Sequence, residues 1–257
     1  MPTRDQYAEG IPSWVDLATP DIEGAKKFYG SLFPWEFADV GNDEYPYAMA
    51  NKNGRAVAGI GVITDDNMPS MWTTYFAVDD AASSAEKVTK AGGQILAGPM
   101  DAMGTGVFVI AAAPGGEVFG LWEAKTHVGA GVVNEHGAVS WNELMTDDVD
   151  GALKFYSDVF GHDTRTADMG GGLMYSTLAV GDRQIAGVMA KPNPDIPNSW
   201  SHYFAVDSTE AACEAVTAAG GTVVWGPQET DGVGIMAGGH DPYGTYFNFM
   251  QSDNLQD

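Results

Sequence analysis

Residues 13–33, SWVDLATPDIEGAKKFYGSLF, recur without a gap at residues 140–160 as SWNELMTDDVDGALKFYSDVF. In this register Trp14 matches Trp141. Three more matches follow in the same order: WTTYFAVDD at 72–80 with WSHYFAVDS at 200–208, KAGGQILAGP at 90–99 with AAGGTVVWGP at 218–227, and APGGEVFGLW at 113–122 with DPYGTYFNFM at 241–250. Similarity of this length, kept in one order, indicates a tandem duplication.

Within each half, the pattern predicts a strand, a helix and then several strands, and it does so twice. Residues 12–18 alternate as a strand does, and Asp21 is suited to cap a following helix. One apolar helical face is formed by Ile22, Ala25, Phe28, Tyr29, Leu32 and Phe33. A second unit starts at Trp72, and its predicted helix over 80–91 ends at the turn Gly92-Gly93. The predicted order is βαβββ, twice per domain.

The chain length and the repeat together define the domain organisation. At 257 residues, with 44% apolar residues, the chain can bury a core in each of two domains. We expect a first domain over residues 1–124, a glycine-containing linker over 125–136 and a second domain over 137–257.

The charge of the chain argues against several classes of partner. Lys and Arg number 12 against 35 Asp and Glu, which gives a net charge of −23. A protein this acidic repels nucleic-acid phosphates and anionic lipid headgroups, so we expect a solvated acidic surface and neither kind of partner. The single cysteine, Cys213, excludes an internal disulfide, and the N-terminal residues do not resemble a signal peptide. We therefore expect a cytoplasmic protein, either a monomer or a homodimer.

Four motifs carry a family resemblance: a helix of the form D-x-x-x-A-x-x-FY-x-x-x-F behind a short strand, the strand YFAVD, an AGG turn and a DPxG turn. Together they resemble the vicinal oxygen chelate superfamily, which includes glyoxalase I, bleomycin and fosfomycin resistance proteins and extradiol dioxygenases. The double length resembles the tandem glyoxalase-like proteins of actinobacteria, which include a mycobacterial antigen and proteins labelled hydroxylases. The resemblance implies an α+β fold, in which paired βαβββ units form a cupped, mostly antiparallel sheet with helices outside.

The resemblance also implies where a metal would bind. Metal-dependent members of the superfamily use His, Gln or Glu at three positions inside the cup. The corresponding residues here are Trp14, Thr73 and Gly120 in the first half and Trp141, Ser201 and Asn248 in the second. A catalytic metal of this kind needs about three protein donors, and none of these residues is a good one. We therefore expect no metal cofactor; the alternative is a divalent metal held by Glu143, His202 and Asn248.

Two carboxylates are the candidate catalytic residues. Alternation places Asp16 on the same side of its strand as Trp14, and Glu143 on the same side as Trp141. If that side faces the cup, burial raises the pKa of both carboxylates, which suits a general base or an acceptor for a ligand N–H or O–H. The alternative is a carboxylate paired with an arginine, such as Arg55 or Arg183, to hold strands together.

The remaining candidates would line the two cups and bind a ligand. They are Trp14, Tyr75 and Trp122 in the first cup and Trp141, Ser201, Tyr203, Asn248 and Met250 in the second. They could stack on a flat or apolar ligand, or they could simply fill the core. The second cup has more polar groups and is the better candidate for function. In a regular strand His202 points away from this cup, so we expect a hydrogen-bonded structural histidine.

These observations favour a glyoxalase-like protein that binds a small, partly apolar metabolite or antibiotic without the usual metal. Such a protein could sequester its ligand or act on it with one carboxylate. One alternative is a metal-dependent lyase, isomerase or dioxygenase with atypical ligands, and another is a non-catalytic interaction protein. Open cups would favour the first hypothesis over an interaction protein. These residues do not decide whether the protein is an enzyme.

Overall fold

The chain folds as four consecutive βαβββ units in the computed structural model, which describes residues 3–63 and 68–253. The first half contains β1 (Pro12–Thr19), α1 (Ile22–Leu32), β2 (Glu36–Asp39), β3 (Tyr47–Lys52), β4 (Arg55–Val62), β5 (Met71–Ala77), α2 (Ala81–Lys90), β6 (Gln94–Asp101), β7 (Gly106–Ala112) and β8 (Val118–Ala124). The second half contains β9 (Val139–Thr146), α3 (Val149–Phe160), β10 (Asp163–Asp168), β11 (Met174–Val180), β12 (Arg183–Ala190), β13 (Ser199–Ala205), α4 (Thr209–Ala218), β14 (Thr222–Thr230), β15 (Gly234–His240) and β16 (Tyr246–Ser252).

Each half forms one eight-stranded sheet, with the orders β2-β3-β4-β1-β5-β8-β7-β6 and β10-β11-β12-β9-β13-β16-β15-β14. In every unit the first strand pairs in parallel with the last, as β1 does with β4. The two units of a half join through antiparallel pairing of their first strands, β1 with β5 and β9 with β13. The predicted α+β class and the repeated βαβββ order are confirmed.

Side-chain caps start all four helices. Asp21 accepts a hydrogen bond from the backbone N–H of Gly24 at 3.0 Å, and Asp148, Asp80 and Ser208 cap the other three helices in the same way. These bonds satisfy amide groups that a helix N-terminus leaves unpaired. Helix α2 ends one residue before the predicted boundary, and Gly92 follows with a φ of +93°, a conformation that favours glycine.

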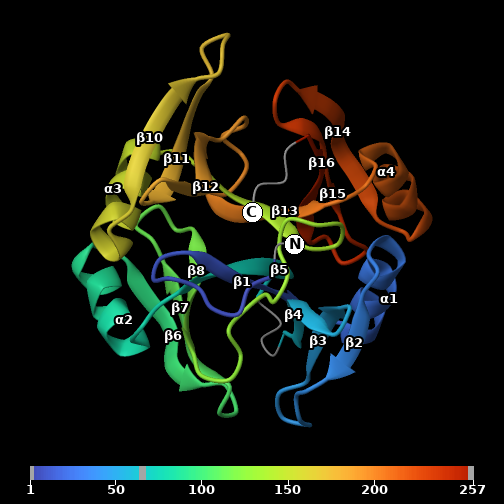
Figure 1. The fold of residues 1–257 in the computed structure, drawn as a ribbon, viewed down its shortest axis with the longest axis horizontal. Helices are drawn as coiled ribbons and strands as arrows, with labels where there is room; N and C mark the ends of the chain where they lie inside the picture. The colour runs from blue at the N-terminus through green and yellow to red at the C-terminus, as the bar shows by residue number, and fades with distance from the viewer. Residues whose placement is uncertain (1–2, 64–67, 254–257) are drawn as a thin grey trace.

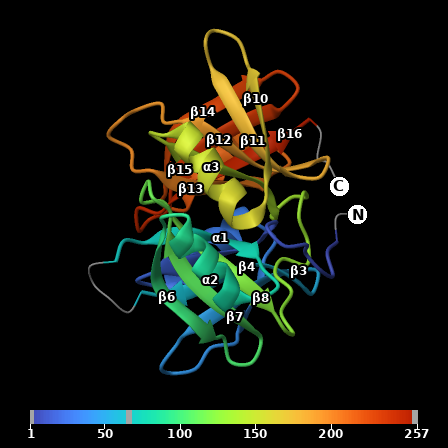
Figure 2. The same cartoon turned by 90° about the vertical axis from the view of Figure 1, so that its left-hand side faces the viewer.

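The two sheets curve into arches that open in opposite directions, toward the top and the bottom of Figure 1. Helices α1 and α4 lie together on one side of the molecule, and α2 and α3 lie together on the other (Figures 1 and 2). Both concave faces are left free of helices. We call the arch of the first half the first cup and that of the second half the second cup. None of the helices in the described ranges is long and apolar enough to cross a membrane.

Two hydrophobic cores join the halves. In one core Phe28 and Tyr29 of α1 pack with Phe204 and Phe247 of the second half. In the other core Phe76 and Phe119 of the first half pack with Phe155 and Tyr156 of α3. The apolar side of each sheet is therefore buried partly by the other half.

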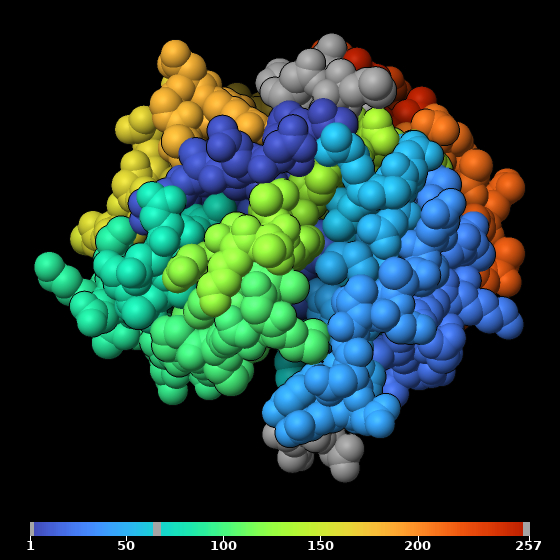
Figure 3. Space-filling model, turned by 60° about the horizontal axis from the view of Figure 1, so that its bottom comes forward, coloured from blue at the N-terminus to red at the C-terminus, as the bar shows by residue number. Residues whose placement is uncertain are grey.

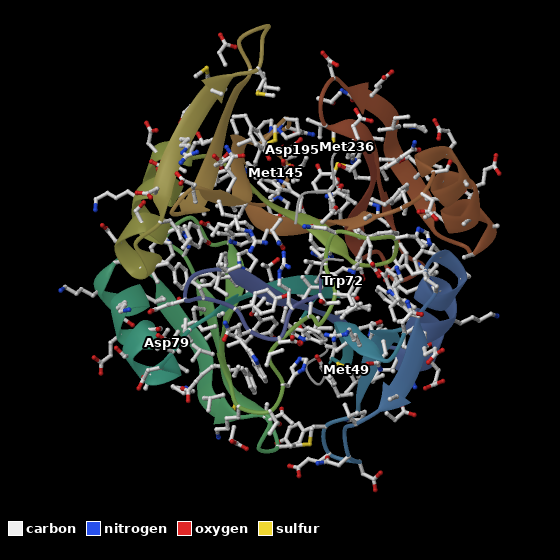
Figure 4. The ribbon with its side chains drawn as sticks, in the orientation of Figure 1. Met49, Trp72, Asp79, Met145, Asp195 and Met236 are labelled. Carbon is white, nitrogen blue, oxygen red and sulfur yellow. The ribbon has the colours of Figure 1, made fainter. Side chains whose placement is uncertain are left out.

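Equivalent tryptophan–tyrosine hydrogen bonds fix both cores. Trp72 Nε1 donates to the Tyr29 hydroxyl at 3.0 Å, and Trp200 Nε1 donates to the Tyr156 hydroxyl at 2.7 Å. Figure 4 shows Trp72 between the two sheets, whereas Met145 and Met236 lie within the arch of the second sheet. Because buried polar groups without partners are costly, these bonds let large amphipathic side chains fill the cores.

His202 lies on the side of β13 opposite the second cup, as alternation predicts, and is 1% exposed. Its ring packs edge-on against Trp72 at a centroid distance of 5.1 Å. The prediction of a hydrogen-bonded histidine is wrong, because neither ring nitrogen has a partner within residues 3–63 and 68–253. Aromatic side chains surround the ring, and burial lowers the pKa of His202 to about 3. His202 is thus a neutral component of the interface between the halves.

Truncating Phe204 tests whether the two halves unfold as one unit. We expect Phe204→Ala to lower the free energy of unfolding by about 3–5 kcal/mol, because it leaves a cavity in a core shared by both halves. Denaturation followed by tryptophan fluorescence and by circular dichroism should show one coincident transition. Val224→Ala, at a residue that is 48% exposed, is the control and should change little. Separate transitions for the two halves would contradict this expectation.

Candidate ligand-binding site

The floor of the second cup carries a carboxylate held by two tyrosines. Glu143 lies on β9, and its Oε2 accepts a hydrogen bond from the Tyr175 hydroxyl at 2.8 Å. Its Oε1 accepts a hydrogen bond from the Tyr203 hydroxyl at 3.1 Å. Trp141 Nε1 donates to the Tyr175 hydroxyl at 2.9 Å and completes the chain. Both oxygens of Glu143 are therefore held in place.

A glycine on the neighbouring strand makes this arrangement possible. Gly187 of β12 pairs with Glu143, and a Cβ atom on Gly187 would lie 1.9 Å from the Tyr175 hydroxyl. Any larger residue would therefore displace the tyrosine from the carboxylate. The first half has the same packing of a tyrosine over a glycine, because a Cβ atom on Gly59 would lie 1.7 Å from the Tyr47 hydroxyl.

Burial controls the ionisation of Glu143. The residue is 7% exposed, and burial raises the pKa of Glu143 although its bonds to Tyr175 and Tyr203 act in the opposite direction. Loss of solvent disfavours the charged form of a carboxylate. A carboxylate with a raised pKa can exchange a proton nearer to neutral pH, or it can accept a hydrogen bond from a ligand.

A cavity of about 1070 Å³ opens above this network. Its apolar wall includes Trp141, Leu173, Met189, Met236 and Met250. The first half and the connecting segment also contribute to its wall, through Tyr7, residues 11–15, Val57, Ala130 and Val133. The cavity is therefore formed by the whole chain and not by the second half alone.

The first cup contains the same network with an aspartate. The hydroxyls of Tyr47 and Tyr75 donate to Asp16 Oδ2 at 3.4 and 3.2 Å, and Trp14 Nε1 donates to the Tyr47 hydroxyl at 3.2 Å. Burial raises the pKa of Asp16 to about 7, and the two tyrosine bonds reduce this effect. The network is a shared property of the duplicated fold.

The first cup differs because the connecting segment partly fills it. The ring of His127 lies between Trp14 and Trp122, with centroid distances of 4.5 and 5.5 Å. Trp122 Nε1 donates to the His127 carbonyl at 2.8 Å, and Ala130 joins the same apolar cluster. Figure 3 shows the yellow-green segment that follows β8 lying across the first domain. The connecting segment thus fills part of the space that a ligand could occupy in this cup.

The structure places the predicted ligand-binding residues of the second cup at two depths. Trp141, Tyr203 and Met250 line the cavity together with Glu143. Ser201 and Asn248 are buried behind the lining, where Asn248 Nδ2 donates to Ser201 Oγ at 3.2 Å. In the first half, Trp14, Tyr75 and Trp122 form one buried cluster.

The alternative pairing of the carboxylates with arginines is wrong, because tyrosines bind both carboxylates. Sequence reasoning missed Tyr47 and Tyr175. A signal was present, since each tyrosine lies twelve residues before the glycine over which it packs, Gly59 or Gly187.

The residues present do not fit a three-donor metal site. Within the described ranges, no group of three or more His, Cys, Asp or Glu residues could hold an ion. Of the alternative set, Glu143 is bound by two tyrosines, Asn248 accepts from the Tyr246 hydroxyl at 2.6 Å, and His202 faces the other side of the strand. These three side chains do not converge on one point and cannot together hold a metal ion.

Two cupped sheets of paired βαβββ units, each with a polar group at its floor, define a class of small-molecule-binding and metal-dependent proteins. The model of the Glyoxalase/Bleomycin resistance protein/Dioxygenase superfamily matches residues 11–121 and 138–249. The chain belongs to this superfamily, as the sequence motifs predicted.

Relatives with the same double length are known in actinobacteria. The chain is 41% identical over 256 residues to the protein named "Putative glyoxylase CFP32" of Mycobacterium tuberculosis, with 98% of each chain covered. It is 31% identical over 263 residues to the anthracycline biosynthesis protein DnrV of Streptomyces peucetius, with 96% of this chain and 94% of that protein covered.

Solved structures share the fold at low identity. The Mn(II)-bound glyoxalase of Novosphingobium aromaticivorans has a TM-score of 0.63 and 18% identity, with 96% of this chain and 86% of that chain covered. The 2,3-dioxygenase LapB of Pseudomonas sp. KL28 has a TM-score of 0.66 and 16% identity, with 98% and 96% covered. At these identities the likeness concerns the fold.

The raised pKa of Asp16 predicts a pH-dependent cost to stability. The native state retains this proton up to about pH 7, whereas the unfolded chain loses it near the ordinary value of 3.8. The stability of the wild type relative to Asp16→Asn should therefore fall by up to about 1.4 kcal/mol per pH unit between these values and be flat outside them.

Urea denaturation of both proteins from pH 4 to pH 8 measures this difference. Asp163→Asn, on the exposed strand β10, serves as the control. A difference between wild type and Asp16→Asn that is independent of pH would contradict the assignment.

Removing the His127 side chain should create an imidazole-sized space between two indole rings. We expect His127→Ala to lose about 1–3 kcal/mol of stability through lost ring contacts. Added imidazole should then raise the melting temperature of the variant more than that of the wild type. Equal responses of the two proteins would show that His127 does not fill the first cup.

Proposed function

We propose that this chain binds a flat, partly apolar small molecule in the second cup and presents Glu143 to one of its polar groups. The observation that carries the proposal is the cavity of about 1070 Å³ with this tyrosine-bound carboxylate at its floor. Small-molecule sites commonly have volumes of about 300–1000 Å³, mostly apolar walls and a few placed polar groups. The volume of this cavity lies slightly above that range, and its lining fits the description.

The walls favour a planar ligand. Trp141 offers an aromatic surface, and methionines such as Met236 and Met250 adapt to the shape of what they contact. The relative DnrV is named for anthracycline biosynthesis, which supports a polycyclic aromatic ligand for this chain. A metabolite or an antibiotic of this kind would be sequestered, or a proton would be removed from it by Glu143 acting as a general base.

The open second cup favours ligand binding over a purely structural interaction role, because a protein without a ligand has no need of a cavity this large. If the chain is an enzyme, the lyase, isomerase or oxygenase type remains our proposal, with Glu143 as the catalytic residue. The first cup, partly filled by His127, has a structural role in this proposal. We also propose that the chain is a monomer or a homodimer in the cytoplasm. The domain limits given above are a prediction as well.

Fluorescence titration with a neutral planar compound, 2-(hydroxymethyl)anthraquinone, tests the proposal. We expect quenching of tryptophan emission with one site per chain. Affinity should increase as the pH rises through the raised pKa of Glu143, because the ionised carboxylate accepts a hydrogen bond from the hydroxyl of the compound.

Glu143→Gln should weaken binding about tenfold and abolish its pH dependence. Met236→Trp should block binding by filling the cavity. Asp16→Asn changes the equivalent carboxylate of the first cup and should leave binding unchanged. Two sites per chain, or binding unaffected by both variants of the second cup, would overturn the proposal.

A further inference from the structure

Arg183 is a cation at the edge of the second cup. It opens β12 and lines the cavity beside Gln184. Within the described part of the chain, no hydrogen bond or ion pair to an acidic residue satisfies its guanidinium. Partial burial and the nearby positive charge of Arg4 lower the pKa of Arg183, and Tyr7 acts in the opposite direction.

The first half offers a direct comparison. Arg55 occupies the equivalent position, since Arg55 pairs with Lys52 at the turn before β4 as Arg183 pairs with Val180 before β12. There the arginine forms an ion pair with Asp5 at 3.2 Å. The chain has 35 acidic residues against 12 basic ones, so an unpaired arginine at this point is unexpected. The duplication has thus kept the cation in both halves, but within residues 3–63 and 68–253 an acidic side chain neutralises it only in the first half.

Two other arginines add positive charge near the same edge. Arg4 is held by its backbone N–H, which donates to the Gly131 carbonyl at 3.0 Å, and its buried Nε has no hydrogen-bond partner within the described residues. Arg165 of β10 also lines the cavity, and its contact with the fully exposed Asp182 is long, at 3.8 Å. The acidic residues that line this cavity are Asp231, in the β14–β15 turn, and Glu143 at the floor.

We infer that the ligand of the second cup carries an anionic group, a carboxylate, which Arg183 binds at the mouth while the planar body reaches toward Glu143. A guanidinium presents two parallel N–H groups that match a carboxylate. The overall charge of −23 repels anions, so a local cluster of arginines is what would admit one. This inference rests on the proposed function and adds the charge and orientation of the ligand to it.

Two probes of equal shape test the inference: anthraquinone-2-carboxylate and the neutral 2-(hydroxymethyl)anthraquinone. We expect the wild type to bind the carboxylate about tenfold more tightly, and we expect added salt to reduce this preference. Arg183→Gln should abolish the preference and leave the affinity for the neutral compound unchanged. Arg55→Gln, which removes the same charge from the first half, should keep the preference.

The binding results distinguish failure of the anionic subsite from failure of the proposed function. Equal binding of both compounds by the wild type, or a preference that survives Arg183→Gln, would overturn the anionic subsite while the proposed function stands. An equal loss in Arg55→Gln would also overturn it, because net charge alone would then explain the preference. Binding of neither compound would overturn the proposed function together with the subsite. Thermal unfolding of each variant confirms that it is folded.

Discussion

The burial of aromatic side chains across the boundary between the halves is the constraint on which the rest of this structure depends. Tyr29 and Phe204 belong to one shared core, and Phe76 and Tyr156 belong to the other. Because the convex sides of both sheets are buried in these cores, the concave sides face outward. The cups therefore open in opposite directions, although residues 11–15 of the first half also line the second cavity.

The same constraint explains why one cup is open and the other is partly filled. The segment between β8 and β9 connects an inner strand of the first sheet to a central strand of the second, and it crosses the first cup on the way. Its later residues, Ala130 and Val133, then form part of the wall of the second cavity. One connection thus reduces the first cup and extends the second, although both retain a tyrosine-bound carboxylate.

Most of the fold could be predicted from the sequence, because the repeat and the strand and helix periodicities are local or nearly local signals. Two partners of Asp16 and Glu143 were missed, because Tyr47 and Tyr175 reach these carboxylates only through the parallel pairing of β1 with β4 and of β9 with β12. The side on which His202 lies followed from alternation. Its surroundings did not, because the other half packs there, and alternation within one strand carries no information about that half.

The position of His127 has a thermodynamic consequence. A covalently attached side chain competes for its cavity at an effective concentration set by the length of the tether, which is on the order of millimolar for short flexible segments. Metabolites at lower concentrations would have to bind far more tightly than His127 to displace it. Joining two copies of one domain into a single polypeptide can therefore restrict ligand access to one of them while both keep a tyrosine-bound carboxylate at the floor.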